Sequence, residues 1–452
     1  MTKHDAVKDE VNQLRRALIF AAGAAGAELS GGVARAQSAA SHPSGASYID
    51  LSCKVSAAQL DAQVAKAFSA FNRPVILPAF NAKTHGALND VELHRIVTHT
   101  VSPETGERLK VSGLLALPAG AKGELPLVSW QHGTILSFDQ VPSNLTKLSD
   151  PDYELTDEAD SLETLFNVQR FAGRGFAVVA ADYVGKGPFR EEHGEAYVVK
   201  GTTVQTCLDI LAAGQAAMGS LGVKPSKLFL NGWSQGALNT LWLHQALRKQ
   251  SRPITATAVA SAFSDLSEAW SYWGGALTFP LPQGVSSYPQ LASWIPLCMI
   301  LALGSYERQY GMKGLLENAV RPEFREFAVK YWKDYKLETN QLSQLPTSKT
   351  LLVPGFYEHA TSPVNSAFLR QFAANDACFW KYDSPIRFHY GLADEAVHPA
   401  MVYRALAAGG MMTQGVKVAG GSHRGTFLAS LYGTGSSLAG FANAVAWFRS
   451  YS

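Results

Sequence analysis

The sequence predicts an α/β protein in which a mostly parallel sheet carries helices on both faces and receives a helical insertion. Short apolar runs alternate with longer helical segments over residues 85–262, and this pattern resumes over residues 346–452. Such alternation is typical of βαβ crossovers, which bury parallel strands between helices. Residues 263–345 are instead rich in Trp, Tyr, Leu and Pro and show no strand-like alternation. We expect these residues to form a helical cap inserted into the α/β core.

The elements of the core are expected in a regular order. Residues 91–101 and 109–117 read as two strands, joined by a turn with the sequence Ser-Pro-Glu-Thr-Gly-Glu. The remaining strands are expected at 126–130, 176–181, 227–231, 256–262, 385–390 and 416–419, and the helices of the core at 162–174, 204–218, 237–247 and 441–451. Within the cap, helices are expected near 291–303 and 322–337.

Composition excludes several classes of function. The chain has 452 residues, 47% hydrophobic content and a net charge of +2, so it can bury a large core. It has no basic stripe, which speaks against nucleic acid as a partner. Its 12 histidines show no HExxH or Cys/His finger spacing, and no Walker-type phosphate loop is present. We therefore expect neither a metal site nor a cofactor.

The N-terminus is expected to direct export. Arg15 and Arg16 precede a modestly apolar run at 17–27, and Ala34-Arg35-Ala36 fits an A-x-A cleavage pattern. Residues 1–36 therefore read as an export signal to the periplasm or the medium, with the paired arginines favouring the twin-arginine route. A disordered Ala/Gly tail is the alternative. The apolar run is too short for stable membrane insertion. Residues 37–84 are expected to form an N-terminal extension that begins with a flexible spacer.

The four cysteines leave two interpretations open. Cys53, Cys207, Cys298 and Cys378 are an even number, so an exported chain could hold one or two disulfides in any of three full pairings. Buried free thiols are the alternative, since a core of this size does not need covalent links.

Residues 232–236, Gly-Trp-Ser-Gln-Gly, have the form G-x-S-x-G and lie between an expected strand and an expected helix. This is the context of the nucleophile elbow of α/β-hydrolases, where a serine sits on a tight turn above the sheet. The pentapeptide alone is a weak signal, but its strand–turn–helix setting is not. Ser234 is therefore the candidate nucleophile, with an ordinary buried turn serine as the alternative.

A serine hydroxyl needs a base, and the base needs a carboxylate to orient it. In this fold the chain order is Ser, then Asp or Glu, then His. Asp394 follows the expected strand at 385–390 and His423 follows the last strand, so they are the candidate orienter and base. The competitors are Glu395 for the acid and His398 for the base, while His389 lies within a strand and reads as a core residue.

An oxyanion hole needs two backbone N–H groups aimed at the developing negative oxygen. The first is expected from Gln235, the residue after the nucleophile. The second is expected from Thr134, in the Gln-His-Gly-Thr loop at 131–134. His132 is expected to order that loop, and a plain tight turn at Gly133 is the alternative.

Three elements in order carry a family resemblance. They are Q-H-G-T at 131–134, D-Y-x-G-x-G at 182–187 and G-x-S-x-G at 232–236. The chain resembles the secretory lipases of the Candida lipase A type and their bacterial esterase relatives over roughly residues 85–452. The resemblance implies an α/β-hydrolase core with a mainly helical lid and places the family's catalytic groups at Ser234, Asp394 and His423. Lys186 departs from the family, where a small or apolar residue is more usual at that position.

These observations predict an exported serine hydrolase that cleaves carboxylic esters through an acyl-enzyme, with no cofactor. The expected partner is a small-molecule or lipid ester with an apolar acyl or aromatic part. Trp233, Trp294 and Leu301 are the candidate substrate-binding residues, because ligand sites are mostly apolar. A peptidase or amidase on the same fold, and a non-catalytic binding protein, are the alternatives.

Overall fold

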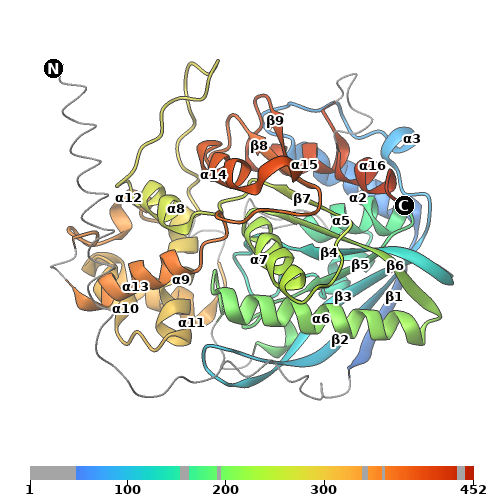
Figure 1. Cartoon of the computed structure of the whole chain (residues 1–452), viewed down its shortest axis with the longest axis horizontal. Helices are drawn as coiled ribbons and strands as arrows, with labels where there is room; N and C mark the ends of the chain where they lie inside the picture. The colour runs from blue at the N-terminus through green and yellow to red at the C-terminus, as the bar shows by residue number, and fades with distance from the viewer. Residues whose placement is uncertain (1–46, 153–161, 191–194, 338–344, 359–361, 435–442) are drawn as a thin grey trace. The chain divides into compact units, whose positions relative to one another are not determined.

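The computed structural model describes residues 47–152, 162–190, 195–337, 345–358, 362–434 and 443–452. Within them lies one nine-stranded sheet with the order β1-β2-β3-β5-β4-β6-β7-β8-β9 (Figure 1). Strands β1 to β3 pair antiparallel with one another and β3 pairs antiparallel with β5, whereas all pairs from β5 to β9 are parallel. The expected export signal lies outside the described residues.

The eight expected strands are present, four of them longer than expected, and β1 is an additional strand. Their bounds are β1 Tyr48–Val55, β2 Val91–Val101, β3 Arg108–Pro118, β4 Gly123–Gln131, β5 Ala177–Ala181, β6 Val223–Trp233, β7 Ala256–Ala260, β8 Ile386–Gly391 and β9 Thr413–Val418. Every residue of β5 and β7 is buried, as expected for central parallel strands covered on both faces.

Helices cover both faces of the sheet. Successive strand residues point to opposite faces: Val178 and Phe229 belong to one buried cluster, and Val179 and Leu230 to the other. The first cluster holds α2 (Ala57–Phe71), α5 (Glu163–Arg170), α15 (His423–Tyr432) and α16 (Ala444–Arg449). The second holds α6 (Lys200–Ser220), α7 (Gln235–Lys249), α14 (Ala400–Gly409) and the helices of the cap. Short helices α3 (Ala82–His85) and α4 (Leu145–Ser149) lie in connecting segments.

The helices of the cap separate β7 from β8 and gather at one end of the sheet (Figure 1). They are α8 (Leu266–Trp273), α9 (Ile295–Gln309), α10 (Leu315–Ala319), α11 (Arg325–Asp334), α12 (Ser348–Leu351) and α13 (Pro363–Ala374). The boundary placed at residue 345 is therefore too early. Phe368 and Phe372 of α13 pack their rings 4.8 and 5.3 Å from that of Trp270 on α8, which makes α13 part of the cap.

From residue 48 onward, the segment expected to be an N-terminal extension is part of the sheet and its core. Strand β1 forms an edge of the sheet, and α2 begins at the Ser56 N-cap, whose side chain accepts the N–H of Gln59. The ring of Phe71 lies 5.0 Å from that of Phe166 on α5. This segment thus belongs to the same core as the sheet.

The four cysteines, all within the described residues, are free thiols, so the structure favours the second of the two interpretations. None of the described helices is both long enough and apolar enough to cross a bilayer.

Candidate active site

Ser234 lies between β6 and α7 with φ = 57° and ψ = −123°, a left-handed conformation that is strained for a residue with a side chain. Its N–H donates to the carbonyl of Ala260 at 3.0 Å, which fixes the turn to β7. Both neighbouring glycines are required by space. A Cβ at Gly232 would lie 2.2 Å from the Gly236 carbonyl oxygen, and one at Gly236 would lie 2.0 Å from that of Gln131.

A chain of hydrogen bonds joins Ser234 to His423 and Asp394, residues far apart in the sequence. The Ser234 Oγ lies 2.9 Å from the His423 Nε2, and the His423 Nδ1 lies 2.9 and 3.1 Å from the two Asp394 oxygens. Ser234, His423 and Asp394 are 6%, 2% and 1% exposed. The network assigns the proton of a neutral imidazole to Nδ1, because Nε2 then accepts from the serine hydroxyl.

Asp394 and its neighbour Glu395 have different hydrogen-bond partners. The Asp394 Oδ1 accepts the N–H groups of Ala396 and Val397 at 3.0 and 2.8 Å, and its Oδ2 accepts the Ser261 hydroxyl at 2.6 Å. The Glu395 carboxylate instead accepts the backbone N–H of His423 at 2.9 Å. Asp394 therefore orients the ring, and Glu395 fixes the start of α15.

The two other candidate histidines lie elsewhere. The ring of His398 stacks on Phe279 at 4.7 Å and lies 4.5 Å from Tyr288, and its Nδ1 accepts the N–H of Ala400. Burial lowers the pKa of His398 to about 4. His389 is 1% exposed within β8.

Negatively charged carboxylates surround His423. Burial by itself lowers the pKa of an imidazole, but Asp394 outweighs it with help from Glu395 and Glu163. The pKa of His423 is therefore raised above its ordinary value of 6.5.

The N–H groups of Thr134 and Gln235 face no hydrogen-bond acceptor among the residues that the structure describes. Gln235 is the first residue of α7, whose N-terminus carries partial positive charge. The N–H of Gly133 is unavailable, since it donates to both oxygens of Glu163 at 2.9 and 3.0 Å. The two donors expected for an oxyanion hole, the N–H groups of Thr134 and Gln235, are thus not engaged by any of the described residues.

Four tyrosine hydroxyls hold the loop after β4. Tyr183 donates to the carbonyl of His132 at 3.0 Å, and the Tyr197 hydroxyl lies 2.9 Å from that of Thr134. From the cap helix α11 and its end, Tyr335 donates to the carbonyl of Ile135 at 2.9 Å and Tyr331 to that of Leu136 at 3.0 Å. His132 orders the loop too, with its Nδ1 2.7 Å from the carbonyl of Gly133. The sequence predicted the role of His132 but not those of Glu163 and the four tyrosines.

Lys186 is buried in an ion pair. Its Nζ lies 2.5 Å from Glu195, and the two side chains are 0% and 1% exposed. The ammonium also lies 5.0 Å from the Tyr183 ring centroid and 6.0 Å from that of Tyr335. Lys186, which departs from the family pattern, is thus paired with a buried carboxylate of the same chain.

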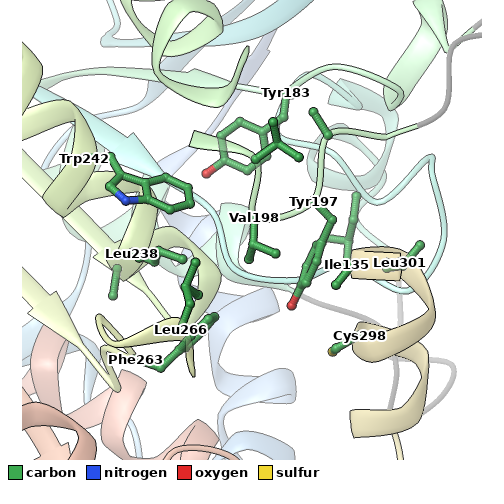
Figure 2. Close-up of a cluster of buried hydrophobic side chains, with 14 of the residues drawn as sticks. Ile135, Tyr183, Tyr197, Val198, Leu238, Trp242, Phe263, Leu266, Cys298 and Leu301 are labelled. Atoms are coloured by element: carbon green, nitrogen blue, oxygen red, sulfur yellow. The ribbon is translucent and has the colours of Figure 1, made fainter. Parts of the chain in front are cut away.

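The candidate substrate-binding residues separate into two groups. The ring centroids of Trp233 and Trp294 lie 4.7 and 5.6 Å from that of His423. Leu301, by contrast, is fully buried on α9, in a cluster that includes Ile135 and Cys298 (Figure 2). Leu301 is therefore a packing residue of the cap.

Among the residues that the structure describes, one group has the composition of a metal site, namely Asp265, Asp376 and Cys378. The two carboxylates of this group have partners within the chain. Asp265 forms an ion pair with Arg404 and caps α8 by accepting the N–H of Glu268 at 2.9 Å. Asp376 accepts the N–H of Leu266 at 2.7 Å. The group thus joins the start of α8 to the segment before β8.

We expect NMR of ¹⁵N-histidine-labelled protein to find His423 titrating above pH 6.5. In Asp394→Asn, burial dominates, and the pKa of His423 should fall below 6.5 because a neutral amide no longer stabilises the imidazolium. His398, which burial keeps neutral, is the internal control and should stay unprotonated in both proteins at pH 6. A His423 that titrates below 6.5 in the wild type would contradict this assignment of charges.

Comparisons with known proteins agree with this architecture. The sequence model of the prolyl oligopeptidase family matches residues 162–273, which include the turn at Ser234. A search of curated proteins finds no match.

Solved structures match most of the chain. A Legionella pneumophila protein provisionally assigned as a hydrolase has a TM-score of 0.69 at 18% identity, covering 89% of this chain and 98% of its own. The rice cell wall degrading esterase LipA from Xanthomonas oryzae has a TM-score of 0.66 at 19% identity, covering 85% and 94%. Candida antarctica lipase A has a TM-score of 0.54 at 13% identity, covering 83% and 77%. The resemblance to the Candida lipase A type is confirmed at the level of the fold: this chain is an α/β-hydrolase-fold protein, related in structure to lipases and esterases.

Proposed function

We propose that this chain is a serine hydrolase that cleaves carboxylic esters. The observation that carries the proposal is the hydrogen-bonded chain from the Ser234 Oγ through His423 to Asp394. In this reaction Ser234 attacks the ester carbonyl while His423 takes the hydroxyl proton on Nε2. The same proton then passes to the leaving alcohol, and Asp394 stabilises the imidazolium throughout.

The negative oxygen of the tetrahedral intermediate would accept the N–H groups of Thr134 and Gln235. Such preorganised donors commonly account for a large part of the rate enhancement, because they need no reorientation when charge develops. Water activated by His423 then releases the acyl group and restores Ser234. No step of this sequence requires a metal or a cofactor.

We further propose that the substrate is a small-molecule or lipid ester with an apolar or aromatic part. Trp233 and Trp294 support this, because both rings lie against His423, where the leaving group must pass. Leu301 is no longer a candidate, since its side chain is fully buried in the cap.

A peptidase or amidase is the second candidate function. It is favoured by the match to the prolyl oligopeptidase family over residues 162–273, which span the proposed nucleophile. Because the same fold supports both reactions, the leaving group decides between them. A protein that only binds ligands would not need the strained Ser234 backbone in contact with His423.

Ser234→Ala and His423→Ala are each expected to lower ester hydrolysis at least about a thousandfold without loss of folding, since each removes a member of one catalytic unit. His398→Ala is the matched control and should keep most of the activity. A fluorophosphonate probe should label Ser234 in the wild type. Labelling at another serine, or a dead His398→Ala with an active His423→Ala, would refute the assignment.

Matched p-nitrophenyl esters and p-nitroanilides with the same acyl groups separate the two candidate reactions. An esterase should hydrolyse the esters and show no detectable turnover of the anilides, since it is not built to protonate a poor amine leaving group, whereas a peptidase should hydrolyse both series. Trp294→Ala should weaken the preference for bulky apolar esters while leaving a small acetate ester little affected. Comparable rates on both series would favour the peptidase.

We also propose that the protein is exported, on the basis of Arg15-Arg16 and the Ala34-Arg35-Ala36 pattern. N-terminal sequencing of the protein from its native host should find a mature chain that begins near Gln37. An intact N-terminus would contradict export.

A further inference from the structure

A further buried carboxylate, Glu163, lies behind the proposed oxyanion hole. It is the first residue of α5 and is 1% exposed. Carboxylates are rarely buried to this degree unless they are paired. Here both oxygens accept the N–H of Gly133 at 2.9 and 3.0 Å, a charge-assisted bond to the residue before Thr134. An acidic residue in the first turn often only complements the helix dipole, but this side chain is directed at another element.

The same carboxylate is linked to His423 through two intervening residues, Gly133 and Trp233. A Cβ on Gly133 would lie 2.8 Å from the Glu163 Oε1 and 3.3 Å from the Trp233 ring. The Trp233 ring in turn lies 4.7 Å from that of His423. Glu163, Gly133, the Trp233 ring and the imidazole therefore follow one another in space.

The charged groups around His423 come from three elements. Asp394 and Glu395 follow β8, Glu163 lies on α5, and Arg424 is the next residue of α15. The Arg424 guanidinium lies 4.6 Å from the centroid of the Phe71 ring, on the α2 side. The three carboxylates all favour a positively charged His423.

We propose that Glu163 is a positioning residue for the hydrolytic reaction, acting on both the oxyanion loop and the base. Its bond to the Gly133 N–H fixes the peptide immediately before the one that carries the Thr134 N–H, and its charge stabilises the His423 imidazolium. The proton of Ser234 goes to the His423 Nε2 and then to the leaving group, and Glu163 takes no part in this transfer. This proposal rests on the proposed function, since it presumes that Ser234 and His423 react.

Two substitutions separate these effects. Glu163→Gln keeps an oxygen acceptor for Gly133 but removes the charge, whereas Glu163→Asp keeps the charge but is one methylene shorter. The readout is the rate at which a fluorophosphonate labels Ser234 as a function of pH. In that step the Ser234 Oγ bonds to phosphorus and fluoride leaves, so it uses the same nucleophile, base and loop without a choice of ester.

The labelling rate should rise with pH as His423 loses its proton. In Glu163→Gln the midpoint should move to lower pH by about half a unit to one unit, because a lost negative charge no longer favours the imidazolium. The plateau rate should fall less than about tenfold. In Glu163→Asp the midpoint should stay near that of the wild type, while the plateau falls about a hundredfold because the loop is misplaced.

Glu104→Gln is the matched control. Glu104 also accepts a glycine N–H, that of Gly201 at 3.0 Å, but contacts no residue of the site. The Glu104→Gln substitution should leave both the midpoint and the plateau of the labelling rate unchanged.

The outcomes are distinguishable. If the wild type is labelled but both Glu163 variants show its midpoint and plateau, the inference about Glu163 is wrong and the proposed function stands. If neither variant folds by circular dichroism, Glu163 is a residue of stability alone, which also overturns the inference. If the wild type is not labelled at Ser234, the proposed function fails, and the inference fails with it.

Discussion

The site depends on the close approach of two backbones, the loop after β4 and the first turn of α7. A Cβ at Gly236 would lie 2.0 Å from the Gln131 carbonyl oxygen, so only glycine permits this contact. The same contact brings the loop that carries Thr134 close to the helix start that carries Gln235. The left-handed backbone of Ser234 then directs its hydroxyl at His423. Burial of the sheet and both helical layers stabilises a turn that is strained in isolation.

A loop that presents an N–H to a reacting oxygen must not relax toward other partners. Tyr331 and Tyr335 bond two consecutive carbonyls of this loop, those of Ile135 and Leu136. If the end of α11 moved away, each buried carbonyl would lose its partner at a cost of about 1–3 kcal/mol. The cap is therefore part of the scaffold of the site, and substrate is expected to enter without displacing α11.

The core could be predicted from the sequence because its strands are continuous apolar runs and its helices have apolar faces. Ser234, Asp394 and His423 could then be assigned from their order in the chain, because each follows the C-terminal end of a parallel strand. Strand β1 gave no such signal, since an edge strand with mostly exposed residues does not alternate clearly. Glu163 reads as an ordinary acidic residue at the start of a helix, and only the fold brings it to Gly133. Leu301 shows the remaining limit: an apolar residue in a cap suits a pocket and a packed interior equally well.

The two histidines of the site have environments that separate their protonation states. His132 is buried near Lys186, and burial together with that ammonium lowers the pKa of His132 well below 6.5. It therefore stays neutral and can donate from Nδ1 to the Gly133 carbonyl without adding a positive charge beside the base. His423 faces three carboxylates, and its pKa is raised.

The Lys186–Glu195 pair bears on the site in two ways, through His132 and through the tyrosines that Lys186 contacts. A neutral residue at position 186 would leave the Glu195 carboxylate buried without its partner, which is costly in a low dielectric. This explains why the departure at Lys186 is compatible with the chemistry proposed for Ser234 and His423.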